Sequence, residues 1–132
     1  MSYFPPGSCM VWGNGAIAAT ADVRFITPGF TAATASLNSS GSFALPKNGT
    51  LRNLTARHTS SNGNGASIVY DVLINGAPSG LQVSLATAAI GSAIDAVNTV
   101  AVAAGDIIEI TGTKALAIGS SSIGSLVTVE YI

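Results

Sequence analysis

Hydrophobic and polar residues alternate with a period of two over much of the chain, which is the spacing of half-buried β-strands. The clearest case is residues 98–110, NTVAVAAGDIIEI, where Val100 and Val102 alternate with small or polar neighbours. Ala104-Gly105-Asp106 breaks the alternation with residues that favour turns, and an apolar face then resumes. The stretch predicts two strands joined by a tight hairpin turn, with Asp106 as a turn-forming residue.

Six other segments have the alternation or the β-prone composition of strands. They are residues 16–26, 41–45, 50–59, 66–74, 81–85 and 125–132. Asn75-Gly76 predicts a two-residue hairpin, and Pro28-Gly29 predicts the end of the first segment. Residues 86–97 are small and interrupted by glycine, which favours a long loop over one turn of helix. About eight short strands without an amphipathic helix indicate one all-β domain, a single jelly-roll β-sandwich of antiparallel strands.

The first 15 residues are the most aromatic part of the chain, and Pro5-Pro6 excludes a regular helix there. They predict an extended N-terminal arm, with the jelly-roll domain in residues 16–132. The arm can pack on its own domain or dock on a neighbour, since interfaces are enriched in Trp, Tyr and Phe. In the second interpretation the docking residues are Tyr3, Phe4, Val11 and Trp12.

Charged residues make up only 8% of the 132 residues, against about 25% in an average globular domain. Either Ser, Thr, Asn and Gly solvate the surface, or copies of the chain or a partner cover much of it. The second interpretation predicts self-association. Net charge is −1 and the five basic residues are scattered, which argues against nucleic-acid binding. Arg52 and Arg57 are an odd number of residues apart, so on one strand we expect them to face opposite sides.

The single cysteine, Cys9, excludes an intrachain disulfide. The first residues lack Lys or Arg before an apolar run, unlike a secretory signal peptide. No apolar run approaches the ~20 residues that span a bilayer. These features predict no membrane partner and a protein that is made in a cytoplasm, then kept there or released by lysis.

Candidate catalytic and metal-binding residues are few. His58 is the only histidine and no serine has a G-x-S-x-G context, so we expect no enzyme and a His58 that is exposed or hydrogen-bonded at the surface. One His, one Cys and six scattered carboxylates predict no metal cluster, although calcium held by loop carbonyls would leave no sequence trace. Polar loops 60–65 and 119–124 stay open as glycan contacts. No cofactor is predicted.

Two segments together resemble a known family. Leu45, Pro46, Gly49, Thr50 and Leu51 fill an apolar-Pro-x-x-Gly-Thr-apolar pattern, and Val100, Val102, Gly105 and Asp106 fill a Val-x-Val-x-x-Gly-Asp pattern. Over about residues 40–132 the chain is similar to trimeric jelly rolls of the tumour-necrosis-factor and complement type found in bacteria and phages. These include the C-terminal domains of collagen-like spore-surface glycoproteins and small knob-shaped virion proteins.

The resemblance implies a homotrimer with a structural role. A collagen-like stalk is missing, so the chain looks more like a virion protein that decorates and cements a phage head, on the capsid surface and in contact with the major capsid protein. By analogy with the family, the last strand supplies the trimer interface through Val127, Val129 and Tyr131. The alternative is a receptor- or glycan-binding knob of a phage fibre or spike, or a bacterial spore-surface protein.

Overall fold

The computed structural model describes residues 8–17, 23–31, 42–61, 66–88, 90–114 and 123–132, and these residues form nine β-strands and no helix. The strands are β1 (Ser8–Ile17), β2 (Val23–Thr31), β3 (Phe43–Ala44), β4 (Gly49–His58), β5 (Ser67–Ile74), β6 (Ala77–Ala86), β7 (Gly91–Val102), β8 (Ile107–Lys114) and β9 (Ile123–Tyr131). The prediction of an all-β chain is confirmed, with nine strands where about eight were expected.

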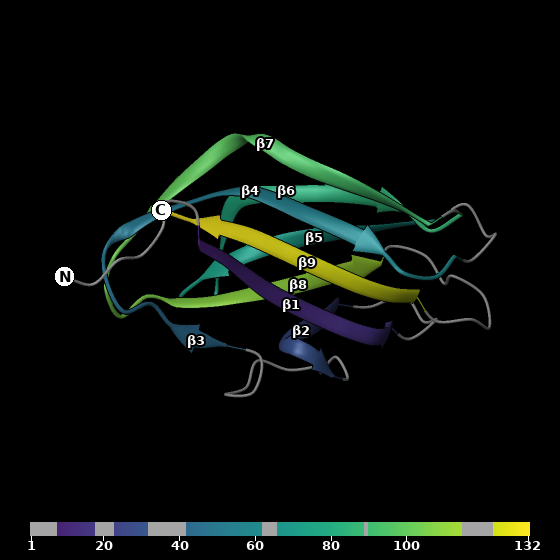
Figure 1. The fold of residues 1–132 in the computed structure, drawn as a ribbon, viewed down its shortest axis with the longest axis horizontal. Coiled ribbons are helices and arrows are strands. Elements are labelled where there is room, and N and C mark those ends of the chain that lie inside the picture. Colours follow the sequence, from purple (N-terminus) through teal and green to yellow (C-terminus); the bar gives the residue numbers. More distant parts are fainter. Residues whose placement is uncertain (1–7, 18–22, 32–41, 62–65, 89, 115–122) are drawn as a thin grey trace.

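The antiparallel strand pairs are nested within one another. The hairpin of β5 and β6 is flanked by the pair β4–β7, then by β3–β8, and finally by β1–β9. Strand order is β1-β9-β4-β7 in one sheet, here called sheet A, and β6-β5-β8 in sheet B, with β3 beside β8. In Figure 1, β9 and β1 of sheet A lie in front of β5 and β8 of sheet B.

Strand β2 belongs to both sheets. Its first part, Val23 to Ile26, pairs antiparallel with β8, and its last part, Gly29 to Thr31, pairs in parallel with β1. Pro28-Gly29 therefore lies inside this strand and does not end it, contrary to the sequence prediction. A proline removes one backbone donor, which a strand tolerates where its pairing changes from one partner to another.

The inward faces of the two sheets form one core. Side chains that are 0% exposed come from both sheets: Trp12, Leu51, Leu54, Val127 and Val129 from sheet A, and Ile68, Tyr70, Val72, Ile108 and Ile110 from sheet B. Each large aliphatic or aromatic side chain buried in this way contributes roughly 1.5–3 kcal/mol. The alternation seen in the sequence is thus the alternation between core and outer face.

Residues 98–110 form strands as predicted, but the predicted hairpin is wrong. β7 pairs with β4 in sheet A, whereas β8 pairs with β5, β3 and β2 in sheet B. The turn between them carries the chain from one sheet to the other. The Asp106 carboxylate accepts a hydrogen bond from the backbone N–H of Ala103 at 2.8 Å, and Gly105 has φ of 88°, so the turn-forming role of Asp106 is confirmed.

One further prediction about a strand boundary is wrong. Residues 91–97, expected in a long loop, begin β7. Residues 8–15 of the expected N-terminal arm belong to β1, which pairs with β9 from Ser8 to Ile17, so this part of the arm packs on its own domain, one of the two alternatives left open by the sequence. Backbone pairing with a neighbour stabilises both segments, and their own alternation is too weak to reveal it.

Candidate functional site

The predicted docking residues do not share one surface. Tyr3 and Phe4 lie outside the described residues. Val11 is 45% exposed on the outer side of β1, whereas Trp12 is 0% exposed and packs in the core. Adjacent residues of a strand face opposite sides, so Trp12 offers no surface for docking, and that part of the prediction is corrected.

The predicted trimer residues Val127, Val129 and Tyr131 all point into the sandwich. They are 0%, 0% and 9% exposed within the single chain, which leaves almost no area to bury against another copy. The apolar alternation of β9 marks the side facing sheet B, and the outward side of the same strand carries Leu126 and Thr128 instead. Assigning the three side chains to an interface is therefore corrected: they belong to the core.

Outward side chains of sheet A form a surface with an uncharged centre. Strand register places Val11, Thr128, Thr55 and Ile94 in one row across β1, β9, β4 and β7. Val11 is 45% and Ile94 56% exposed. This surface, from Val11 to Ile94 with its neighbouring outward residues, is called the sheet A face below. The row therefore has an exposed apolar side chain at each end and two half-buried threonines between them, without a charge.

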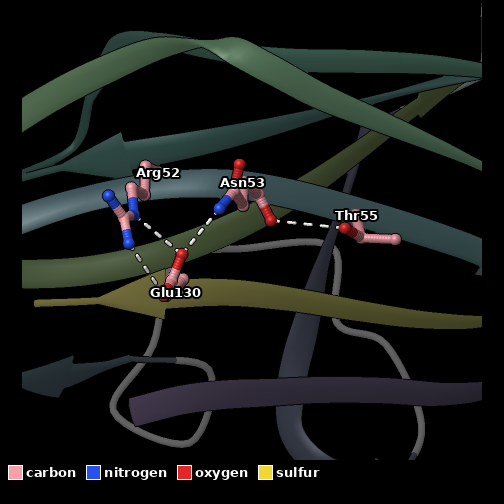
Figure 2. A network of polar contacts seen from close by, with 4 residues as sticks. All are labelled: Arg52, Asn53, Thr55 and Glu130. Atoms are coloured by element: carbon pink, nitrogen blue, oxygen red, sulfur yellow. Dashed lines mark hydrogen bonds and ion pairs between the residues drawn. The ribbon is translucent and has the colours of Figure 1, made fainter. Parts of the chain in front are cut away.

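One charged network borders this row (Figure 2). The Arg52 guanidinium donates to the Glu130 carboxylate from Nε at 2.7 Å and from Nη2 at 3.1 Å, and Asn53 Nδ2 donates to the same carboxylate at 2.6 Å. These hydrogen bonds hold the pKa of Glu130 below its usual value. The acid and the base of this network neutralise each other, so the sheet A face gains no net charge from them.

A bulge in β4 explains how Arg52 and Arg57 come to lie on the same side of the sheet. Asn53 has φ of 52°, and the register with both neighbouring strands shifts at this residue. Leu51 and Leu54 consequently both face the core, although they are three residues apart. The prediction that the two arginines face opposite sides is wrong, because it assumed unbroken alternation.

Opposite this bulge, β7 protrudes. Arg52 pairs with Thr99 and Leu54 with Asp95, so residues 96–98 stand against Asn53 alone. Asp95 holds the protrusion in place: its Oδ1 accepts from the backbone N–H groups of Val97 and Asn98 at 3.2 and 3.0 Å. An Asp side chain commonly accepts a hydrogen bond from the backbone N–H two residues on, as Asp95 does from Val97.

Asp95 also ties the edges of the two sheets together. Its Oδ2 accepts from the backbone N–H of Gln82 on β6 at 3.3 Å. The hydrogen bonds to Asn98, Gln82 and Val97 lower the pKa of the carboxyl group. Val97 is left 88% exposed at the tip of the protrusion. Ile90, Ile94 and Val97, called the β7 ridge below, are thus exposed apolar side chains along one sheet edge.

A polar cluster lies at the sandwich end that holds the turn before β8. Asn75 Nδ2 donates to Asp106 Oδ1 at 2.9 Å, while Asn75 Oδ1 accepts from Ile107 N–H at 2.9 Å. Asn48 Oδ1 accepts from Ala104 N–H, also at 2.9 Å. These side chains fasten three turns together. Within the described ranges no group of three or more His, Cys, Asp or Glu residues could hold a metal ion.

The other sandwich end encloses a buried polar relay. His58 Nε2 lies 2.8 Å from the Tyr70 hydroxyl, which in turn contacts Ser125 Oγ at 2.5 Å, and His58 Nδ1 lies 3.1 Å from the Ala86 carbonyl oxygen. His58, Tyr70 and Ser125 are all 0% exposed. The prediction of a surface histidine is wrong, because His58 occupies a core-facing position of β4. Burial lowers its pKa and raises that of Tyr70.

This relay lacks the arrangement that activates a serine nucleophile. Ser125 Oγ bonds the Tyr70 hydroxyl and not the imidazole, and an activated serine needs a base within hydrogen-bond reach. Complete burial of the three side chains also separates them from any substrate. Of the loops considered for glycan contacts, residues 62–65 and 119–122 lie outside the described part of the chain.

Glu109 was not singled out from the sequence. It lies on the outward side of β8, yet it is 1% exposed, and neither carboxylate oxygen has a hydrogen-bond partner. Burial raises the pKa of this carboxyl group. Its position between Ile108 and Ile110 places it on the side away from the core, but nothing in the alternation signals that the outer side of β8 is covered too.

Comparison with known proteins adds a distant structural likeness. No protein-family model matches the sequence, and no curated protein matches it. The structure is similar to a family two carbohydrate esterase from Cellvibrio japonicus, at 16% sequence identity and a TM-score of 0.37. The match covers 96% of this chain and 35% of the esterase chain, so this chain spans little more than a third of that protein. A likeness this weak supports no conclusion about activity. Among the described residues, none belongs to a helix that could cross a membrane.

Proposed function

We propose that the chain is a homotrimeric jelly-roll protein that decorates and cements the head of a bacteriophage, bound to the major capsid protein on the outside of the shell. The resemblance in residues 43–54 and 98–110 supports the family assignment. The observation that carries a structural role is the sheet A face, where an uncharged row leaves Val11 and Ile94 about half exposed on a folded chain.

The nested strand pairing supports the jelly-roll assignment. A jelly roll is one long antiparallel hairpin rolled into two sheets, so that its first strand pairs with its last and each inner pair follows. The pairs β1–β9, β3–β8, β4–β7 and β5–β6 have this order, with β2 as the added strand.

The trimer contact in this proposal uses outward side chains. The β7 ridge of one copy packs against the part of the sheet A face around Thr55 and Thr128 of the next copy, and not against Val11 itself. This contact replaces the buried side chains of β9 as the proposed trimer interface. The ridge lies at β7, whereas Thr55 and Thr128 lie on β4 and β9. A head-to-tail contact between two such different surfaces forms a ring when its rotation closes after three copies. Ile94 and Val97, at 56% and 88% exposure, supply apolar area to bury at roughly 25 cal/mol per Å².

Val11 is the remaining described candidate for docking on the shell. It lies on β1, three strands away from β7, so a trimer held by the β7 ridge leaves the Val11 side chain accessible. Three copies of Val11 and of the preceding segment would bind the shell together, and three weak contacts held in one trimer add as avidity.

The test is to add the full chain to phage heads that lack it and to locate it by electron cryomicroscopy. We expect three-fold density on the outer shell, and a Val11→Asp variant that remains trimeric but binds the heads at least tenfold more weakly. Ser84→Asp, on the exposed outer side of β6, is the matched control and should bind normally. Heads that stay bare would refute the cement role, and glycan binding by the same preparation would favour a receptor-binding knob.

A further inference from the structure

The buried relay of His58, Tyr70 and Ser125 connects the two sheets at one end of the sandwich. His58 ends β4 and Ser125 lies beside it on β9, both in sheet A, whereas Tyr70 comes from β5 in sheet B. The carbonyl of Ala86 at the end of β6 completes the relay. The same three side chains therefore join four strands in a region from which water is excluded.

The Ala86 carbonyl oxygen determines which atom donates and which accepts in each hydrogen bond of the relay. A carbonyl oxygen can only accept, so His58 Nδ1 carries the ring proton and donates to Ala86. His58 Nε2 is then an acceptor, and the Tyr70 hydroxyl donates to it. With its own proton used in this way, Tyr70 accepts from the Ser125 hydroxyl. The relay is complete only while the imidazole is neutral.

Adding a proton to the ring breaks this order. Nε2 becomes a second donor, so Tyr70 must turn its hydroxyl proton toward Ser125. The Ser125 hydroxyl then loses the acceptor it has in the neutral relay, and an unpaired buried donor is costly. The positive charge would also lie in the core, whose low polarity disfavours ions.

Among the described residues, the charged groups nearest to these side chains do not compensate a charge on His58. Lys114, the charged residue of β8 on this side, is in register with core residue Ile68 and has the same sign as the protonated ring. Asp95 of β7 is already bound to Asn98 and to the N–H of Gln82. Tyr70, the titratable group of β5, has its pKa raised by burial and stays neutral. The strands β6 and β9 contribute only Ala86 and Ser125.

We propose that His58 is an acid-sensitive latch, which joins the two sheets at this end while its ring is neutral and releases the end when the ring is protonated. The opposite end is held by independent bonds, including Leu45 N–H to the Asp106 carbonyl and Asn75 N–H to the Ile107 carbonyl, each at 2.9 Å. Acid therefore opens one end and leaves the other closed. This inference does not depend on the proposed function.

The sign of the pH effect follows from burial. The folded state disfavours the charged ring and lowers the pKa of His58 below its ordinary value of 6.5. The opened end, where the ring meets water, binds a proton more readily. The latch is fully effective above pH 6.5, and its contribution is lost as the pH falls from there to the folded pKa. Across that interval, each decrease of one pH unit raises the equilibrium constant for opening of this end about tenfold.

Nuclear magnetic resonance of the full chain tests the latch directly, because its one histidine gives an unambiguous ring signal. We expect the Nδ1–H tautomer at about pH 8, and a ring midpoint below pH 6.5. Amide exchange should report opening at Thr59 and Thr87, whose N–H groups donate to Gly124 and Ala66 at this end. The amides of Leu45 and Asn75 should keep their protection.

Two variants separate the latch from general stability. His58→Gln cannot be protonated, so its Thr59 and Thr87 amides should lose the acid-dependent opening. Thr87→Val removes only the hydrogen bond from the Thr87 hydroxyl to the Ala66 carbonyl and keeps the backbone one. It should open this end more at every pH, with the pH dependence unchanged. If His58→Gln does not fold, the wild-type titration decides alone. An Nε2–H tautomer, a ring midpoint at the ordinary value, or simultaneous loss of protection at both ends would overturn the proposal.

Discussion

Gly49 lies directly beneath the ring of Tyr131, with no room for a side chain between them. A Cβ atom on Gly49 would lie 2.6 Å from the Ile132 carbonyl oxygen and would also meet the Tyr131 ring. The Tyr131 hydroxyl donates to the Lys47 carbonyl at 2.5 Å, and Thr50 exchanges backbone hydrogen bonds with Ile132. Glycine is therefore required at position 49, in the Pro-x-x-Gly-Thr segment, for the end of β9 to pack against the start of β4.

Gly49→Ala should destabilise the fold by about 1–3 kcal/mol, the usual cost of forcing extra atoms into a packed site. The measurement is chemical denaturation at neutral pH. Gly91→Ala is the matched control, because a Cβ there has no atom within 4 Å, and it should leave stability nearly unchanged. Equal effects of the two substitutions would mean that the contact with Tyr131 does not matter.

The sequence predicted the strands more reliably than their partners. Alternation identified the core faces of β5 and β8, and Asn75-Gly76 formed the expected hairpin turn, with φ of 52° and 82°. It could not tell that β7 and β8 lie in different sheets, because alternation specifies a buried face and not a neighbour. The beginning of β7 was missed because Ile94 and Val97 point outward there.

Asp95→Ala should destabilise the protein by about 2 kcal/mol, because a largely buried carboxylate that accepts several hydrogen bonds is lost. Asp71→Ala is the control, since its bond to Gln82 Nε2 lies at the exposed surface; we expect a change within about 0.5 kcal/mol. Thermal unfolding of both variants measures the difference.

The pH dependence of the Asp95 effect has a defined sign. Hydrogen bonds lower its folded pKa, so its contribution to stability is present above the unfolded value of 3.8 and is lost as the pH falls below it. The difference between wild type and Asp95→Ala should therefore shrink at acidic pH. A difference that stays constant from neutral to strongly acidic pH would contradict this role.

Glu109→Gln should stabilise the protein by about 1 kcal/mol at neutral pH, because it removes a charge that is buried without a hydrogen-bond partner. The pKa of Glu109 is raised, so its unfavourable effect is greatest above the folded pKa and is relieved as the pH falls toward the unfolded value of 4.5. The gain in the variant should disappear in acid, which denaturation at two pH values would detect.

Glu130→Gln provides the opposite control for this prediction. Glu130 is bound by Arg52 and Asn53, so the same substitution should lower stability there. If Glu130→Gln stabilised the protein, or Glu109→Gln destabilised it, hydrogen bonding to the carboxylate would not decide whether such a substitution raises or lowers stability.

The proposed interaction surface could be inferred from the sequence only in part. Low charge directed attention to uncharged exposed area, and the Val11 side chain is exposed on the outer side of β1. The most apolar positions of the last strand were chosen for the interface, but apolar alternation marks the core first, and Val127 and Val129 satisfy the core of a single chain. The β7 ridge depends on the Asp95 turn, which positions Val97 through contacts with Gln82 that are distant in the sequence.

Ile94→Asp should convert the proposed trimer to a monomer, because the substitution places a charge in the contact between the β7 ridge and the sheet A face. The folding stability of the Ile94→Asp monomer should change little, since the Ile94 side chain is 56% exposed in the single chain. Ser84→Asp adds the same charge to the outer side of β6 and should leave the assembly intact. A trimeric Ile94→Asp would exclude this contact.

The mass of the wild-type protein in solution tests the central claim most directly. Light scattering coupled to size-exclusion chromatography should give three times the chain mass of 13.1 kDa over a wide range of protein concentration. A mass of 13.1 kDa that persists at high concentration would contradict the proposed homotrimer.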